Sequence, residues 1–300
     1  MSYPKLPVPA PGEVLLVSTC YEEDKPRWDE VLGALGGRRD GDVVTLDDGG
    51  ARLRLAEHPR WDFLHGGNFP ALLPEDGEVP PLVALADLSA VYGAGAVLLV
   101  DLKVIPGRGV RVPADALGRV LAQLLDGSLH FDELVRGMDR NGYYPSPWDE
   151  PAISVPTTVV RASYPPLPAT EMTLLVRTDF TDDASWHALM EAHGKLPKNG
   201  GDDEFDLEFQ LESLVVDDRE FEHLQPGQVP ALVPPEEHTI MVALADAETM
   251  ADPKHPLFVV DLYDTPGQAT RVPLVEAGLM AVNLEIANMD FSDFVDMEFE

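Results

Sequence analysis

Four aspartates in the second half of the chain stand where apolar, strand-like segments end: Asp179, Asp217, Asp246 and Asp261. The carboxyl ends of parallel strands meet at one edge of an α/β sheet, where ligands commonly bind. Since Mg²⁺ and Mn²⁺ prefer oxygen ligands, these acids could form a divalent-cation site, with Arg177 and Arg271 holding a phosphate. Aspartates are also common at helix caps, and an ion pair between Asp261 and Arg271 across a hairpin would account for both residues without a ligand.

The first half offers a weaker version of this set, because a thiol replaces one acid: Cys20, Glu57, Asp87 and Asp101. Cys20 stands opposite Asp179, so we interpret it as a small residue at a strand end rather than as a nucleophile. No histidine of one half matches a histidine of the other, which excludes a histidine mechanism shared by both. The sequence has no GxSxG, HExxH, GxGxxG or Walker motif, so an enzyme is the less favoured interpretation.

The two halves of the chain are copies of each other. The words VALAD, VDL, PG and RVP occur in this order in both, beginning at Val83, Val100, Pro106 and Arg111 and again at Val242, Val260, Pro266 and Arg271. Most matching positions are apolar or turn-forming, which indicates a shared core. The matching polar residues form three pairs: Asp87 with Asp246, Asp101 with Asp261, and Arg111 with Arg271. A site common to both halves would be built from these six residues.

Each copy shows the element order β-α-β-α-β-β-β-α. Apolar or alternating segments predict strands at 14–17, 51–56, 83–87, 96–102 and 109–112, and again at 173–179, 211–216, 242–246, 256–262 and 269–272. Short helices are expected at 60–64 and 219–224, and a Pro-Gly turn joins the last two strands of each copy into a hairpin. We therefore predict two tandem copies of a layered α/β domain, each with a mostly parallel sheet and an antiparallel edge hairpin.

Composition indicates where the copies begin and end. The predicted divisions are an extended N-terminal segment at 1–12, a first and divergent repeat at 13–142, a linker at 143–171 and a second repeat at 172–300. The linker holds seven prolines and no helical period, which predicts a semi-rigid connection. Part of it could pair as a strand through Val155, Val159 and Val160.

The second copy carries four characteristic runs in order: LLVRTDF at 174–180, ADAET at 245–249, HPLFVVDL at 255–262 and NLEIANMDF at 283–291. By these runs it resembles a domain of unknown function found largely in actinobacterial proteins. The first copy keeps LLVST, VALAD and LLVDL, but it has Cys20 for Asp179, His58 for Asp218, and SLHF at 128–131 for NMDF at 288–291. The resemblance implies a shared fold for the two copies and carries no activity with it.

The chain is strongly acidic, with 53 acidic and 21 basic residues and a net charge of −32. Residues 1–150 hold 14 basic and 24 acidic residues, a net charge of −10, whereas residues 151–300 hold 7 and 29, a net charge of −22. A field of this sign repels nucleic-acid phosphates and anionic lipid, so we expect neither nucleic acid nor a membrane as a partner. It attracts basic proteins, although the same charge also promotes solubility.

The sequence gives three indications of where the protein acts. No basic and then apolar leader opens the chain, and no apolar run has the length of a membrane span. The single cysteine, Cys20, cannot form an internal disulfide, which agrees with a reducing compartment. We therefore expect a cytoplasmic protein.

The last residues, NMDFSDFVDMEFE from Asn288, alternate acids with aromatic and apolar side chains. One interpretation is a partner-binding segment that uses Asp290, Phe294, Asp296 and Phe299. The other is a final helix that docks Phe291 and Phe294 onto the core.

Together these patterns favour a non-enzymatic, acidic protein-binding module that needs no cofactor and engages a basic partner. An immunity protein or antitoxin that neutralises a cationic toxin fits this description. The alternative is a Mg²⁺- or Mn²⁺-dependent enzyme that acts on a phosphorylated small molecule at the strand-end aspartates. A structural scaffold subunit is the third interpretation.

Overall fold

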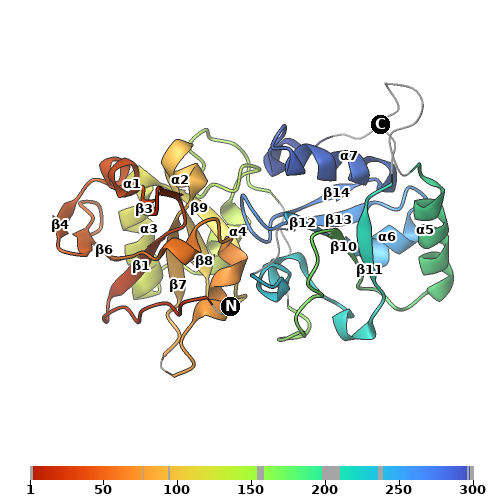
Figure 1. The fold of residues 1–300 in the computed structure, drawn as a ribbon, viewed down its shortest axis with the longest axis horizontal. Helices are drawn as coiled ribbons and strands as arrows, with labels where there is room; N and C mark the ends of the chain where they lie inside the picture. Colours follow the sequence, from red (N-terminus) through yellow and green to blue (C-terminus); the bar gives the residue numbers. More distant parts are fainter. Residues whose placement is uncertain are drawn as a thin grey trace. The chain divides into compact units, whose positions relative to one another are not determined.

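The computed structural model describes residues 3–76, 78–93, 95–153, 159–197, 210–235, 239–295 and 297. The chain divides into two compact units, Met1–Thr157 and Thr158–Glu300, which Figure 1 colours from red to yellow-green and from green to blue. Each unit combines a sheet with helices, so the predicted pair of α/β domains is confirmed. None of the helices in the described parts of the chain has the length and apolar composition needed to cross a bilayer.

The first unit is built on a seven-stranded sheet whose three central strands are parallel. In spatial order the strands are β4 (Arg38–Asp40), β5 (Val43–Thr45), β6 (Arg52–Ala56), β1 (Glu13–Ser18), β7 (Leu82–Ala86), β8 (Ala96–Asp101) and β9 (Gly109–Pro113). β1 lies between β6 and β7 and is buried along its whole length, as its apolar run predicts for a strand covered on both faces. The β4–β5 hairpin extends one edge of the sheet and the antiparallel strands β8 and β9 extend the other.

The second unit repeats this arrangement with five strands. Their spatial order is β11 (Ser213–Val216), β10 (Thr173–Arg177), β12 (Met241–Ala245), β13 (Leu257–Asp261) and β14 (Ala269–Val272). β11, β10 and β12 are parallel, and β13 and β14 complete the sheet antiparallel. The predicted hairpin of the last two strands is thus present in both units.

The hairpin strands β8 and β13 also run antiparallel to the strand before them. The connection from β7 to β8 spans only residues 87–95, and that from β12 to β13 spans residues 246–256. A parallel connection needs a crossover of a dozen or more residues, so these short links force the chain to reverse. Each link contains one short helix that the sequence pattern does not predict: α2 (Leu88–Tyr92) in the first unit and α6 (Ala247–Ala251) in the second.

The remaining elements cover the two sheets. In the first unit they are β2 (Tyr21–Glu22), β3 (Lys25–Pro26), α1 (Trp28–Leu35), α3 (Ala114–Asp126), α4 (Phe131–Gly137) and the 3₁₀ turns η1 (Pro59–Trp61) and η2 (Gly66–Leu72). In the second they are α5 (Asp183–Lys195), α7 (Leu274–Glu285), η3 (Arg219–Phe221), η4 (Pro226–Gln228), η5 (Pro230–Leu232) and η6 (Phe291–Asp293). The short helices expected at 60–64 and 219–224 are therefore single 3₁₀ turns, η1 and η3. α3 packs on β8 and β9 and against α1.

Each unit opens with an extended segment that packs into the hydrophobic core of that unit through a leucine. Leu6 and Leu167 are buried in the two cores, and their N–H groups donate to Leu72 O at 2.9 Å and Leu232 O at 2.8 Å. Both stand in the pattern YPxLP, at 3–7 and 164–168. The N-terminal segment and the end of the predicted linker are therefore matching parts of the two units. The start of that linker belongs to the first unit, since Tyr144 pairs with Arg111 on β9.

Candidate functional site

The repeated aspartate after VALAD pairs with the repeated arginine of RVP in both units. Asp87 caps α2 through the N–H of Ala90 at 2.9 Å and accepts from Arg111 Nη2 at 2.9 Å. Asp246 caps α6 in the same way and receives both terminal nitrogens of Arg271, at 2.8 and 2.6 Å. Burial alone would raise the pKa of Asp246, but hydrogen bonds from Arg271 and Thr249 hold it below its ordinary value. These pairs fasten a helix start to the last strand of the sheet.

The repeated aspartate of VDL folds a loop in both units. Oδ1 of Asp101 accepts from the N–H groups of Lys103 and Val104, both at 2.9 Å, and Oδ2 accepts from Ile105 at 3.0 Å. Asp261 accepts in the same pattern from Tyr263, Asp264 and Thr265, at 2.8, 3.2 and 2.5 Å. The partner of each VDL aspartate is therefore its own loop, and Asp261 does not form the ion pair with Arg271 that the sequence allowed.

One residue distinguishes the two VDL loops. In the first unit the buried guanidinium of Arg108 donates to Asp101 Oδ2 from Nε at 3.1 Å and from Nη2 at 3.0 Å. Gln268 occupies the matching position of the second unit, where its backbone O accepts from the N–H of Asp261 as Arg108 O does from Asp101. Burial, and after it the charge of Asp264, raises the pKa of Asp261 to about 7.

The four proposed metal-binding aspartates do not come together. Asp246 follows the end of β12, whereas Asp261 lies opposite Met241 at the beginning of β12. We expected all four acids at the end of the sheet where the parallel strands terminate. Because β13 is antiparallel to β12, this expectation was wrong for Asp261, which lies at the opposite end of the strands. Within the described residues, no group of three or more His, Cys, Asp or Glu side chains is arranged to hold a metal ion.

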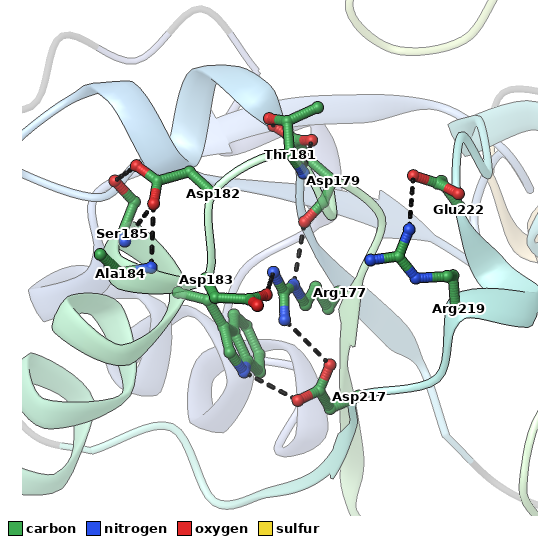
Figure 2. Close-up of polar contacts among 11 residues, drawn as sticks. Arg177, Asp179, Thr181, Asp182, Asp183, Ala184, Ser185, Asp217, Arg219 and Glu222 are labelled. Atoms are coloured by element: carbon green, nitrogen blue, oxygen red, sulfur yellow. Dashed lines mark hydrogen bonds and ion pairs between the residues drawn. The ribbon is translucent and has the colours of Figure 1, made fainter.

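The other strand-end acids of the second unit surround Arg177, a residue at the end of β10 whose side chain is only 4% exposed (Figure 2). Its Nη2 donates to Asp183 at 2.6 Å, Nη1 to Asp217 at 3.3 Å and Nε to the backbone oxygen of Asp179 at 2.9 Å. The guanidinium also lies 4.3 Å from the ring centre of Phe180 and 5.3 Å from that of Trp186. Arg177 is thus held from several sides rather than left open for a phosphate.

Each acid around Arg177 has a structural partner. The carboxylate of Asp179 accepts from Thr181 through the backbone N–H at 2.9 Å and the hydroxyl at 3.0 Å. Asp217 accepts from Trp186 Nε1 at 3.0 Å as well as from Arg177. The hydrogen bond from Arg177 holds the pKa of Asp183 below its ordinary value, so this exposed carboxylate stays charged. The Arg177 cluster, defined by Arg177, Asp179, Asp183, Asp217 and Trp186, therefore presents negative charge to solvent.

The first unit keeps part of the Arg177 cluster. Trp28 Nε1 donates to Glu57 at 2.5 Å, as Trp186 does to Asp217. Ser18 ends β1 where Arg177 ends β10. Cys20 is buried, and burial raises its pKa with a further contribution from Asp62. A buried thiol with a raised pKa is a poor nucleophile, which favours our interpretation of Cys20 as a packing residue.

The residues proposed for partner binding near the C-terminus fall into two groups. Phe291 and Phe294 are buried, and the backbone oxygen of Phe294 accepts from Thr270 Oγ1 at 3.2 Å. Asp290 is exposed and precedes η6. Asp296 and Phe299 lie outside the described residues. Phe294 therefore packs into the unit, and Asp290 is the described member of the set that faces solvent.

Comparison with known proteins relates the chain to one family. The profile of a family described as Domain of unknown function (DUF6924) matches it twice, over residues 13–146 and 172–299. No curated protein and no solved structure matches the chain.

Proposed function

This chain belongs to the DUF6924 family, whose domain it carries in two copies, and we propose that it is a non-enzymatic module whose acidic second repeat binds a basic protein. The proposal rests on how the second repeat uses its charges. Its half of the sequence has 7 basic residues against 29 acidic ones. Two of the basic residues, Arg177 and Arg271, are committed to ion pairs inside the unit.

Of the acids that pair with these arginines, Asp183, Asp217 and Glu248 remain open to solvent, whereas Asp246 is half-buried. The side chain of Asp183 is 72% exposed although it contacts Arg177, and Glu248 is 65% exposed although it lies 3.1 Å from Arg271. The buried Arg177 and the half-buried Arg271 therefore position acidic groups instead of neutralising the surface around them. A field of one sign steers an oppositely charged protein and raises its rate of association.

A metal-dependent enzyme is the less supported alternative. To bind these acids, Mg²⁺ would have to displace Arg177 from Asp217 and Arg271 from Asp246. Asp261 could not join them, because it lies at the opposite end of the strands. A scaffold role would show itself as a discrete large oligomer in light scattering.

The surface chemistry fits an immunity protein or antitoxin, which masks a cationic toxin by charge complementarity. We expect the protein to act in the cytoplasm, where its buried free thiol, Cys20, meets no oxidising environment.

Partner capture across a salt series tests this function. The full chain is immobilised and exposed to native lysate, beside a variant in which three exposed acids of the second repeat become glutamine: Glu212, Glu220 and Glu285. A matched control changes three exposed acids of the first repeat to amides: Asp29, Glu75 and Glu78.

We expect a basic protein to be retained at low salt by the wild type and the control, to be released as salt rises, and to be lost from the second-repeat variant. A protein whose retention is unchanged by added salt and by the three substitutions in the second repeat would contradict the proposal. Retention of nothing, together with saturable binding of Mg²⁺ in calorimetry, would favour the enzyme instead.

A further inference from the structure

The first repeat contains a built-in binding site for a guanidinium group. Arg108 is only 2% exposed and donates two hydrogen bonds to Asp101 from Nε and Nη2. Its Nη2 also contacts Asp132, and its guanidinium lies 5.4 Å from the ring centre of Phe131. Carboxylates on one side and an aromatic face on the other are the groups that recognise arginine.

The second repeat keeps the loop aspartate and the aromatic residue of this site, but it lacks the arginine and has Ser292 in place of Asp132. Asp261 holds the same loop as Asp101, Phe291 stands where Phe131 stands, and the uncharged Gln268 replaces Arg108. A pocket of about 80 Å³ borders Asp261, with Asp264, Asp290 and Phe291 among its lining residues. The second repeat has Asp264 where the first has the apolar Val104, so it has gained this acid beside Asp261 while losing the acid Asp132 and the cation Arg108.

We propose that this Asp261 pocket binds the guanidinium of an arginine side chain supplied by the basic partner. The inference rests on the proposed function, because it names the chemistry that the partner must present. The second repeat would then take from another protein the group that the first repeat supplies from its own Arg108.

The size and lining of the pocket suit this occupant. One water-sized group fills roughly 10–15 Å³ on this measure, so the pocket has room for the few heavy atoms of a guanidinium. Three carboxylates and no Lys or Arg are among the lining residues that the structure describes. The planar guanidinium can bond Asp261 while its face lies on Phe291, which a lysine ammonium does less well.

The electrostatics of the pocket favour a cation. Burial and the neighbouring charge of Asp264 raise the pKa of Asp261, so the charged form of this carboxylate is disfavoured in the pocket. A bound guanidinium would relieve this repulsion and lower the pKa again. Binding should therefore strengthen as the pH rises through neutrality and Asp261 loses its proton.

Nuclear magnetic resonance of the full chain tests the pocket directly. Met289 lines it, so a ¹³C-labelled methionine methyl serves as a local reporter. The probes are N-acetyl-arginine amide, the uncharged isostere N-acetyl-citrulline amide, the corresponding lysine amide, and Mg²⁺ alone.

We expect a saturable shift of the Met289 methyl with the arginine probe, and at least a several-fold weaker response to lysine. Gln268→Arg restores the arginine of the first repeat and should abolish the shift, as should Asp261→Asn. Glu191→Gln removes an exposed charge on α5 and should leave the shift unchanged.

Equal responses to arginine and citrulline, tighter binding of Mg²⁺ or lysine, or full binding by Gln268→Arg would each overturn the proposal. Because Asp261→Asn could disturb its loop, Gln268→Arg is the deciding variant, with its fold checked by circular dichroism. A salt-sensitive partner that binds Gln268→Arg and wild type equally would contradict the pocket and leave the proposed function standing. Loss of that partner in the triple variant of Glu212, Glu220 and Glu285 tests the function separately.

Discussion

The polar residues that the two repeats share hold particular pieces of backbone in place. Asp87 and Asp246 start short helices and bind the arginines of the last strand, and Asp101 and Asp261 each gather three N–H groups of a loop. Their repetition therefore follows from the fold. The residues that differ between repeats, such as Gln268 for Arg108, are the more informative ones for function.

Replacement of Arg111 should lower the stability of the first unit more than replacement of the matching Arg271 lowers that of the second. The ion pair of Arg111 with Asp87 is largely buried, while Arg271 and Asp246 are each more than a quarter exposed. Removing one partner of a buried pair costs about 3–5 kcal/mol, so Arg111→Met should lower the stability of its unit by that order. Arg271→Met should cost about 1 kcal/mol, because solvent screens the aspartate left behind.

Hydrogen exchange read separately in β7 and β12 measures the two effects in the same chain. An equal loss of protection in both units would contradict the assignment of Arg111 to a buried structural pair.

Asp261 should make the second unit less stable as the pH rises. Its ordinary pKa of 3.8 is raised to about 7 in the folded unit. Between these values the folded carboxyl keeps its proton while the unfolded one has lost it, so the free energy of unfolding falls with increasing pH. In Asp261→Asn this contribution is absent.

Urea unfolding of the wild type and of Asp261→Asn from pH 4 to pH 8 checks the sign. The variant should gain stability relative to the wild type across this range, whereas Glu191→Gln, whose carboxyl has its pKa lowered by Lys195, should not. Parallel curves for Asp261→Asn and wild type would show that Asp261 has an ordinary pKa.

At the scale of the elements, the sequence predicted the five strands that the two copies share, from apolar or alternating segments, but it did not predict β2, β3, β4 or β5 of the first unit. It did not predict the direction of β8 and β13, since burial on both faces is the same for a parallel and an antiparallel strand. The direction of these two strands follows from the short connections that precede them, which are too short for a parallel crossover. The pattern YPxLP also occurs once in each copy, and it marks the extended segment that packs into the core of each unit.

The candidate site was only partly predictable for a related reason. Arg177 and the four aspartates were recognisable as strand-end residues, but their meeting depended on strand direction, which placed Asp261 at the far edge. The aligned copies show Gln268 in place of Arg108, yet the sequence does not reveal that Arg108 binds Asp101. The replacement of Arg108 by Gln268 can be interpreted only from the structure, which shows the buried hydrogen bond between Arg108 and Asp101.

Gly118 on α3 allows a close approach between that helix and the loop that precedes β6. A methyl group added at Gly118 would lie 1.8 Å from the backbone oxygen of Asp48. Since overpacking of this kind costs about 1–3 kcal/mol, Gly118→Ala should destabilise the first unit by that order.

Gly33 on α1 provides the matched control, because a methyl group there meets no atom within 4 Å. Gly33→Ala should stabilise its helix by about 0.5–1 kcal/mol. Thermal unfolding of both variants measures the difference, and a neutral Gly118→Ala would show that α3 does not press on this loop.

For the whole molecule, the duplication has produced two units with one fold and different surfaces. The first half carries a net charge of −10 and supplies its own guanidinium at the VDL loop. The second half carries −22, has Gln268 in place of Arg108, and has a pocket beside Asp261 with no arginine among its described lining residues. This asymmetry suits a chain in which one repeat meets a basic partner.

The association rate of the retained partner, measured against ionic strength, tests this account most directly. Surface plasmon resonance would compare the wild type with the triple variant of Glu212, Glu220 and Glu285 and with the first-repeat control. Electrostatic steering predicts a wild-type association rate that falls steeply with added salt and falls at low salt in the triple variant, with the control unchanged. An association rate that is independent of salt, or equally reduced by both sets of substitutions, would contradict the assignment of partner binding to the acidic second repeat.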